Sequence, residues 1–188
     1  MIVAITGCIG SGKTYILNKI HDIYNYDVFS ADTFVQMAYE DKNIQLKLDQ
    51  AFNCLVNEKI NKNIIKSKLN SDTIIILNNI IHPYVIDKIN EVKKQYNNSI
   101  SFIEVPLLFE ANLQNLFDYT ISISIDDNLR LKRLLNRDKD NYKNMLELQK
   151  HQYSNEKKAS LANFVLNTSD DELLNLKKLD DIIKVITK

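Results

Sequence analysis

Several residue types are scarce in this 188-residue chain, and each scarcity excludes a class of protein. The only cysteines, Cys8 and Cys54, lie too far apart in the sequence to indicate a disulfide framework or a zinc site. They favour a reduced environment, and we expect a cytoplasmic protein. Tryptophan is absent, and glycine and proline occur only three and two times, which excludes fibrous and low-complexity classes.

Neither sign of charge dominates, because 24 Lys and Arg residues balance 24 Asp and Glu residues. A nucleic-acid surface or a polybasic membrane anchor would require a basic excess, so we expect neither partner. No apolar run approaches the ~20 residues that cross a bilayer. Residues 1–6 carry no basic leader and predict no signal peptide. The length of 188 residues and the ordinary apolar content fit one globular domain, so we expect a single domain over residues 1–188.

Short apolar segments alternate with helical patterns along the chain. The predicted strands are 1–6, 26–30, 100–105, 119–125 and 163–166, and the clearest predicted helices are 14–24, 82–96, 128–136 and 169–186. This alternation predicts an α/β fold, with a parallel sheet covered by helices on both faces. The sequence does not decide the secondary structure of residues 73–81. Their β-branched side chains favour a strand, whereas the following His-Pro pair at 82–83, typical of a helix start, favours a helix.

All three glycines fall in one motif. Residues 7–14 read Gly7-Cys8-Ile9-Gly10-Ser11-Gly12-Lys13-Thr14 and fit G-x-x-x-x-G-K-[ST], after an apolar strand and before an amphipathic helix. Such a loop turns its backbone N–H groups toward an anion, and the helix adds the positive end of its dipole. Lys13 would contact the β- and γ-phosphates, and the Thr14 hydroxyl would ligate Mg²⁺. A plain glycine turn would explain the glycines but not Lys13 and Thr14.

Other classes with this loop do not fit the sequence. Regulatory GTPases need a later Asp-x-x-Gly, but no glycine follows Gly12, and residues 61–64 read Asn-Lys-Asn-Ile without the guanine-reading aspartate. Motor and transporter ATPases need a longer chain with a recognisable Walker B strand. A small phosphotransferase remains. Its acceptor hydroxyl could lose a proton to Asp32, which ends the second predicted strand; alternatively, Asp32 caps the following helix.

Further motifs extend the pattern over most of the chain. They are Ala31-Asp32, Leu77-Asn78-Asn79-Ile80-Ile81-His82-Pro83, Val105-Pro106-Leu107-Leu108-Phe109-Glu110, Leu131-Lys132-Arg133 with Arg137-Asp138, and then Gln152, Lys158 and Ala162. Together with the loop at 7–14, these motifs resemble those of the dephospho-coenzyme A kinase family.

The resemblance implies a three-layer P-loop kinase fold with a five-stranded parallel sheet. Within it we expect a mostly helical acceptor-binding lobe at 33–98 and a lid at 136–152. The implied reaction transfers the γ-phosphate of ATP, with Mg²⁺, to the ribose 3′-hydroxyl of dephospho-coenzyme A, giving coenzyme A and ADP. A nucleoside or nucleotide kinase of the same fold and a non-catalytic ATP-binding regulatory protein are the alternatives.

The resemblance also assigns site residues. The expected catalytic residues are Asp32 as general base, Lys13 and Arg137. The expected ATP-binding residues are Gly7, Cys8, Ile9, Gly10, Ser11, Gly12, Lys13, Thr14, Tyr15, Arg133 and Arg137. The expected acceptor-binding residues are Asp32, His82, Pro106 and Glu110, with Glu110 paired to a lysine, an arginine or an acceptor group. Without the resemblance, His82 reads as a histidine that satisfies backbone groups at a helix start. This chain departs from the family at Tyr15, Ser30, Gln36, Lys62 and Asn163.

The only three arginines lie close together, at 130, 133 and 137. Their spacing predicts one helix face, opposite a buried stripe of Leu131, Leu134 and Leu135. Because lysine is plentiful in this chain, retained arginine suggests bidentate phosphate recognition. A solvated basic face is the alternative. We expect Arg137 to hold the ATP phosphates, whereas Arg130 falls at a variable position of the family.

Overall fold

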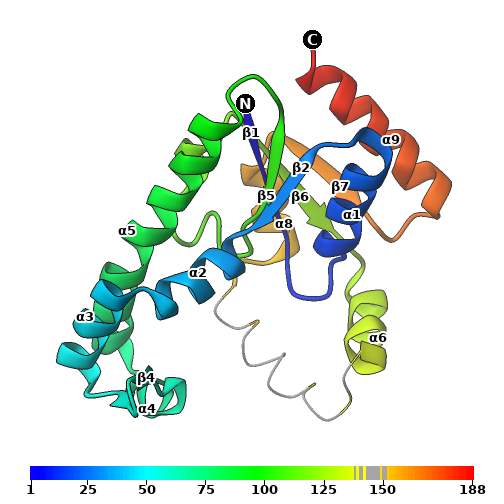
Figure 1. Ribbon diagram of the computed structural model, residues 1–188. Coiled ribbons are helices and arrows are strands. Elements are labelled where there is room, and N and C mark those ends of the chain that lie inside the picture. The colour runs from blue at the N-terminus through cyan, green and yellow to red at the C-terminus, as the bar shows by residue number, and fades with distance from the viewer. Residues whose placement is uncertain (138, 140–141, 143–148, 150–151) are drawn as a thin grey trace. The chain divides into compact units, whose positions relative to one another are not determined.

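The computed structural model describes residues 1–188 except 138, 140–141, 143–148 and 150–151 (Figure 1). The chain divides into two compact units. The first, the sheet unit, comprises Met1–Phe29 and Tyr96–Lys188, and the second, the helical unit, comprises Ser30–Gln95. The helical unit includes most of the region 33–98 in which we expected an acceptor-binding lobe.

A five-stranded sheet organises the first unit. Its strands are β1 (Ile2–Thr6), β2 (Asp27–Ser30), β5 (Ser101–Glu104), β6 (Tyr119–Ser124) and β7 (Phe164–Asn167), in the order β2-β5-β1-β6-β7. β1 lies in the centre and pairs in parallel with β5 and β6. Every residue of β1 is buried, as expected for a strand covered on both faces. The five predicted strands are thus confirmed, with ends shifted by a residue or so.

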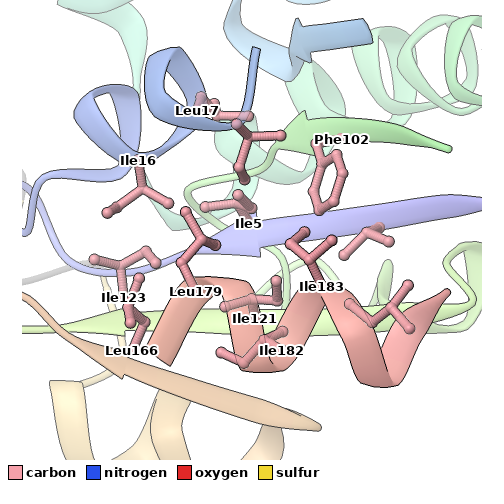
Figure 2. Packing of buried hydrophobic residues seen from close by; sticks show 13 residues of the cluster. Ile5, Ile16, Leu17, Phe102, Ile121, Ile123, Leu166, Leu179, Ile182 and Ile183 are labelled. Carbon is pink, nitrogen blue, oxygen red and sulfur yellow. The ribbon is translucent and has the colours of Figure 1, made fainter. Parts of the chain in front are cut away.

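Helices cover both faces of this sheet. α1 (Lys13–Tyr24) and α9 (Glu172–Ile186) lie on one face, and α8 (Asn155–Leu161) packs against β6 on the other (Figure 1). Figure 2 shows how α1 and α9 bury their apolar stripes against the sheet. Ile16 and Leu17 of α1 meet Ile5 and Phe102 of the strands, and Leu179 of α9 belongs to the same cluster. The predicted α/β fold is confirmed.

Among the described residues, the sheet unit also contains α6 (Asp127–Arg137) and a short 3₁₀ helix, Gln114–Leu116. α6 follows β6 almost directly and matches the helix predicted at 128–136. Within the described ranges, no helix is both long enough and apolar enough to cross a membrane.

The helical unit contains α2 (Ala31–Glu40), α3 (Lys42–Phe52), the two-stranded ribbon β3 (Leu55–Val56) and β4 (Lys59–Ile60), α4 (Lys62–Lys68) and α5 (Ser71–Gln95). α5 resolves the ambiguity at 73–81, which is helical, and shows that the predicted helix start at 82 is wrong. Pro83 lies inside α5, although proline lacks the N–H that a helix interior uses. Packing explains the exception, because α5 buries Ile81, Val85, Ile89 and Val92 within one long helix.

Candidate functional site: a phosphate loop and an adjoining cavity

The glycine motif forms the connection between β1 and α1. Gly7, Gly10 and Gly12 have φ angles of 149°, 83° and 93°, which side-chain-bearing residues rarely adopt. At Gly7 the backbone also runs close to β6: a Cβ atom there would lie 2.4 Å from the carbonyl oxygen of Ile123. α1 begins at Lys13, so the N-terminus of the helix, with the positive end of its dipole, lies at the loop and suits an anion.

The two polar side chains that end the motif meet a carboxylate that sequence reasoning missed. Lys13 is buried; its Nζ donates to the carbonyl oxygen of Cys8 at 3.2 Å and lies 3.7 Å from Oε1 of Glu104. The Thr14 hydroxyl donates to Oε2 of Glu104 at 3.1 Å. Glu104 is the last residue of β5, the strand beside β1. A carboxylate at the end of an apolar strand was the signal that could have identified it.

This Thr14–Glu104 pair fits the ligand chemistry of Mg²⁺, which binds hydroxyl and carboxylate oxygens and keeps several ligand positions for water and phosphate. Among the described residues, no group of three or more His, Cys, Asp and Glu side chains could hold a metal ion. Mg²⁺ in nucleotide sites is commonly bound by one or two protein oxygens together with substrate phosphates, and the Thr14–Glu104 pair fits that pattern.

Helix α6 packs directly onto the loop. A Cβ at Gly10 would lie 2.9 Å from side-chain atoms of Leu134 and 3.2 Å from Cγ of Arg130. The predicted leucine stripe is therefore only partly right: Leu134 is buried, but Leu135 is 40% exposed. Arg130, expected on the face opposite the stripe, is only 3% exposed because its guanidinium bonds the side chains of Asp127 at 3.0 Å and Gln149 at 2.8 Å.

A cavity of about 400 Å³ adjoins the last glycine of the loop. Its lining residues are Gly12 and Tyr15, Arg133 of α6, and Thr168, Asp170, Glu172 and Asn175 after β7. Arg133 is held in place by Thr168, donating to its hydroxyl at 3.1 Å and to its carbonyl oxygen at 2.9 Å. The Thr168 hydroxyl in turn donates to the carbonyl oxygen of Ser11 in the loop at 2.8 Å. Sequence reasoning found Arg133 but missed Thr168.

Tyr15, one of the departures from the family pattern, lines the same cavity. Its hydroxyl donates to Oε1 of Glu172 at 2.6 Å, and Lys19 pairs with the same carboxylate at 2.8 Å. The hydrogen bond to Glu172 raises the pKa of Tyr15, which therefore stays a protonated donor. This contact links the first turn of α1 to the start of α9 at one side of the cavity.

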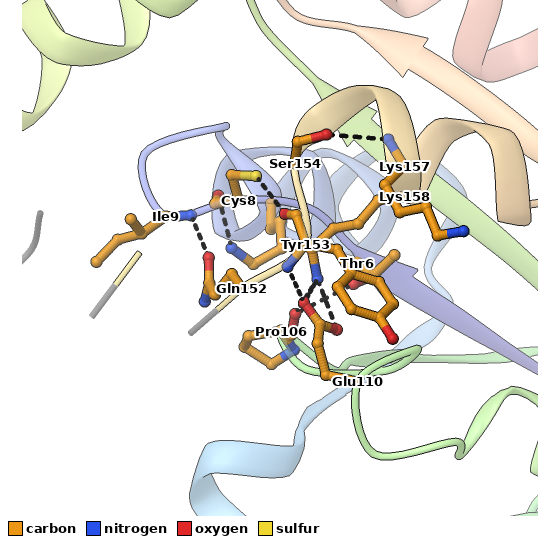
Figure 3. A network of polar contacts seen from close by, with 11 residues as sticks. Thr6, Cys8, Ile9, Pro106, Glu110, Gln152, Tyr153, Ser154, Lys157 and Lys158 are labelled. Atoms are coloured by element: carbon orange, nitrogen blue, oxygen red, sulfur yellow. Dashed lines mark hydrogen bonds and ion pairs between the residues drawn. The ribbon is translucent and has the colours of Figure 1, made fainter. Parts of the chain in front are cut away.

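The predicted acceptor residues Pro106 and Glu110 meet at Lys158, a fully buried lysine of α8 (Figure 3). The Lys158 Nζ donates to the carbonyl oxygen of Pro106 at 2.7 Å and pairs with Glu110 at 2.8 Å. The expectation that Glu110 pairs with a lysine or arginine is thus confirmed. The Thr6 hydroxyl at the end of β1 also donates to the Pro106 carbonyl oxygen, at 3.3 Å.

The other acceptor-side candidates lie in the helical unit. Asp32 is exposed in the first turn of α2, and Gln36 lies four residues later, on the same face of that helix. The N-cap of α2 is Ser30, so the alternative role of Asp32 as a cap is wrong. His82 is half-buried within α5, where burial lowers the pKa of its ring. The alternative that His82 starts a helix is therefore also wrong.

Two predictions concern the chain after α6. Arg137 is the last residue of that helix, and its side chain lies outside the described part of the structure. Most of the predicted lid, 136–152, also lies outside it. Gln152 is described: its side-chain oxygen accepts a hydrogen bond from the N–H of Ile9 in the loop, at 3.1 Å.

Asn163, another departure, has a structural position. Its Oδ1 accepts from the N–H of Thr120 at 2.8 Å and from the Thr120 hydroxyl at 3.0 Å. These bonds join β6 to the chain just before β7. A carboxylate oxygen could accept the same two bonds, so this position suits asparagine and aspartate alike.

Comparisons with known proteins cover the whole chain. The sequence model of one family, described as dephospho-CoA kinase, matches residues 1–173. A dephospho-CoA kinase of Rickettsia felis is 31% identical, over 100% of this chain and 98% of its own length. A solved dephospho-CoA kinase from Campylobacter jejuni superposes with a TM-score of 0.68 at 25% identity, covering 98% of this chain and 96% of that chain. A solved shikimate kinase from Bacteroides thetaiotaomicron, covering 100% of this chain and 99% of its own, shares the fold at a TM-score of 0.54 and 11% identity.

Proposed function

Because this chain belongs to the dephospho-CoA kinase family, we propose that it transfers the γ-phosphate of ATP to the ribose 3′-hydroxyl of dephospho-coenzyme A. The products are coenzyme A and ADP. The observation that supports this best is the complete phosphate loop, with Lys13 buried and bonded to the Cys8 carbonyl oxygen, and with a cavity of about 400 Å³ beside Gly12. The two free, buried cysteines, Cys8 and Cys54, suit a cytoplasmic enzyme.

ATP would bind with its phosphates on the loop and its base in the adjoining cavity. The phosphates would accept hydrogen bonds from the N–H groups of the loop and the first turn of α1. Lys13 would then exchange part of its interaction with Glu104 and the Cys8 carbonyl for phosphate oxygens. Arg133 lines the cavity with its guanidinium already oriented by Thr168, which limits the entropy lost when a ligand binds.

Thr14 and Glu104 would hold Mg²⁺, which supplies charge neutralisation for the phosphates when it is bound. In this structure the hydroxyl hydrogen of Thr14 points to Glu104. The hydroxyl would turn to offer a lone pair, and Glu104 would remain as the nearby negative charge. Arg137 would add a further positive charge to the phosphates, as its match to the family motif implies.

The acceptor side rests on Asp32. Its carboxylate is exposed at the start of the helical unit, immediately after β2, and it would take the proton of the 3′-hydroxyl as that oxygen attacks the γ-phosphorus. A general base of this kind contributes about 10²–10⁴-fold to the rate. His82 and Pro106 would shape the acceptor site, as their positions in the family motifs imply.

The test is a product assay with the purified protein. The protein is incubated with ATP and Mg²⁺, first with dephospho-coenzyme A and then separately with nucleosides and nucleoside monophosphates, and the products are separated by chromatography. We expect coenzyme A and ADP in equal amounts and no phosphorylated nucleoside. Phosphorylation of a nucleoside without coenzyme A formation would assign a different kinase activity. ATP binding without any transfer would indicate a regulatory protein.

A further inference from the structure

Glu110 has no carboxylate oxygen free to bind a substrate, because both oxygens already have partners. Oε1 accepts from the backbone N–H of Tyr153 at 2.6 Å and lies 2.8 Å from Nζ of Lys158. Oε2 accepts from the same Nζ at 3.0 Å. The Lys158 side chain is 0% exposed and that of Glu110 is 13% exposed. A substrate group that took Glu110 would leave a buried ammonium without its carboxylate, at a high energetic cost.

Gln152 and Tyr153, the segment that Glu110 holds, are in turn bonded to the phosphate loop (Figure 3). Next to Tyr153, the side-chain oxygen of Gln152 accepts from the Ile9 N–H at 3.1 Å. The carbonyl oxygen of Tyr153 accepts from the Cys8 thiol at 3.4 Å. Burial raises the pKa of that thiol, so it keeps the proton that it donates. Residues 152–153 therefore join Glu110 to two consecutive residues of the loop.

These contacts bear on how the loop binds phosphate. An anion site made of backbone N–H groups depends on the orientation of successive peptide planes. The N–H of Ile9 is used by Gln152, and the N–H of Ser11 donates to the Cys8 carbonyl at 3.1 Å. Both bonds orient the peptides at the start of the loop.

We infer that Glu110, together with Lys158, Tyr153 and Gln152, positions the phosphate loop for ATP and does not bind the acceptor. The inference rests on the proposed function, since it reassigns one residue of that site. Its consequence is a division between the two substrates: loss of these contacts weakens nucleotide binding and leaves the affinity for dephospho-coenzyme A unchanged.

The test uses two variants of the full chain and a matched control. Glu110→Gln keeps an oxygen for the Tyr153 N–H but removes the charge that faces Lys158. Gln152→Ala removes only the acceptor of the Ile9 N–H, and its partly exposed side chain makes it safe for folding. The control, Glu156→Gln, changes an exposed carboxylate of α8 that lies outside these contacts.

Binding of Mg²⁺–ADP is measured by calorimetry without the acceptor, and the KM of each substrate is measured in the forward reaction. We expect Gln152→Ala to weaken ADP binding about two- to tenfold, the range for one hydrogen bond, and Glu110→Gln to weaken it at least as much. In both variants, the KM for dephospho-coenzyme A should stay within twofold of the value for the unsubstituted chain. In the control, the ADP affinity and both KM values should also stay within twofold of the unsubstituted chain. Unchanged ADP affinity in Gln152→Ala would overturn the inference, as would a rise confined to the acceptor KM in Glu110→Gln.

The two proposals fail in distinguishable ways. If the natural chain formed no coenzyme A, the proposed reaction would be wrong, but the ADP measurements would still test the support of the loop. A purely structural role of Glu110 and Gln152 would lower the unfolding temperature and leave the ADP affinity of the folded protein unchanged.

Discussion

Replacement of Gly7 by alanine tests the account of the phosphate loop most quantitatively. The new Cβ would lie 2.4 Å from the Ile123 carbonyl oxygen and 2.7 Å from the Ser11 hydroxyl oxygen, distances that real Cβ atoms do not show. The carbonyl belongs to β6, where Ile123 pairs in parallel with Leu166 of β7, so it cannot move without disturbing that strand pair. The φ angle of 149° adds backbone strain. We assign about 2 kcal/mol to the strain and about 2 kcal/mol to the overpacking.

The measurement is the midpoint of thermal unfolding, followed by circular dichroism without nucleotide. About 4 kcal/mol corresponds to a decrease of roughly 8–16 °C for a chain of this size. Gly12→Ala is the matched control: its φ of 93° imposes similar strain, but the nearest atom to its Cβ would be 3.5 Å away, an ordinary contact. The unfolding midpoint of Gly12→Ala should fall by about half as many degrees. If Gly7→Ala unfolded at the same temperature as Gly12→Ala, the close approach of the loop to β6 would not be the constraint that we describe.

Three further predictions follow from the site. Asp32→Asn should lower kcat about 10²–10⁴-fold while ADP affinity persists; unchanged turnover in a steady-state assay would remove Asp32 as the general base. Glu104→Gln removes the charge beside Thr14, so half-maximal activity should require more Mg²⁺ than in the natural chain, and an identical Mg²⁺ titration would contradict its role. Burial lowers the pKa of His82, so the unfolded chain binds the proton first as the pH falls. The stability from neutral His82 is present above about pH 6.5 and is lost as the pH falls below it. The free energy of unfolding of His82→Asn should therefore depend less steeply on pH between about pH 7 and 5.5 than that of the unsubstituted chain. Equal slopes in denaturant unfolding would refute this.

The parts of the fold that depend on local patterns were predictable. The loop, β1 and α1 form one continuous stretch of sequence, and their motif has a physical reason at each position. The three inner strands, β1, β5 and β6, were visible because buried parallel strands are short apolar runs. The extent of α5 was not, since proline disfavours a helix interior, whereas α5 continues through Pro83 and packs against α2 and α3.

The parts of the site that depend on distant contacts were not predictable from spacing. Glu104 reaches Thr14 across 90 positions, and Lys158 reaches Glu110 across 48. The resemblance identified Glu110 and Lys158 as characteristic residues, but not that one neutralises the other. Arg130 was also misplaced: its spacing predicted the helix face opposite the buried leucines, whereas it is buried and its guanidinium bonds Asp127 and Gln149.

The central claim is that this chain phosphorylates one particular hydroxyl of dephospho-coenzyme A. The most direct measurement is a ³¹P NMR spectrum of the product formed from ATP, Mg²⁺ and dephospho-coenzyme A by the purified chain. We predict a new phosphomonoester resonance at the ribose 3′ position, growing at the rate at which ADP appears. ADP formation without that resonance, or a phosphoester at another position, would contradict the account.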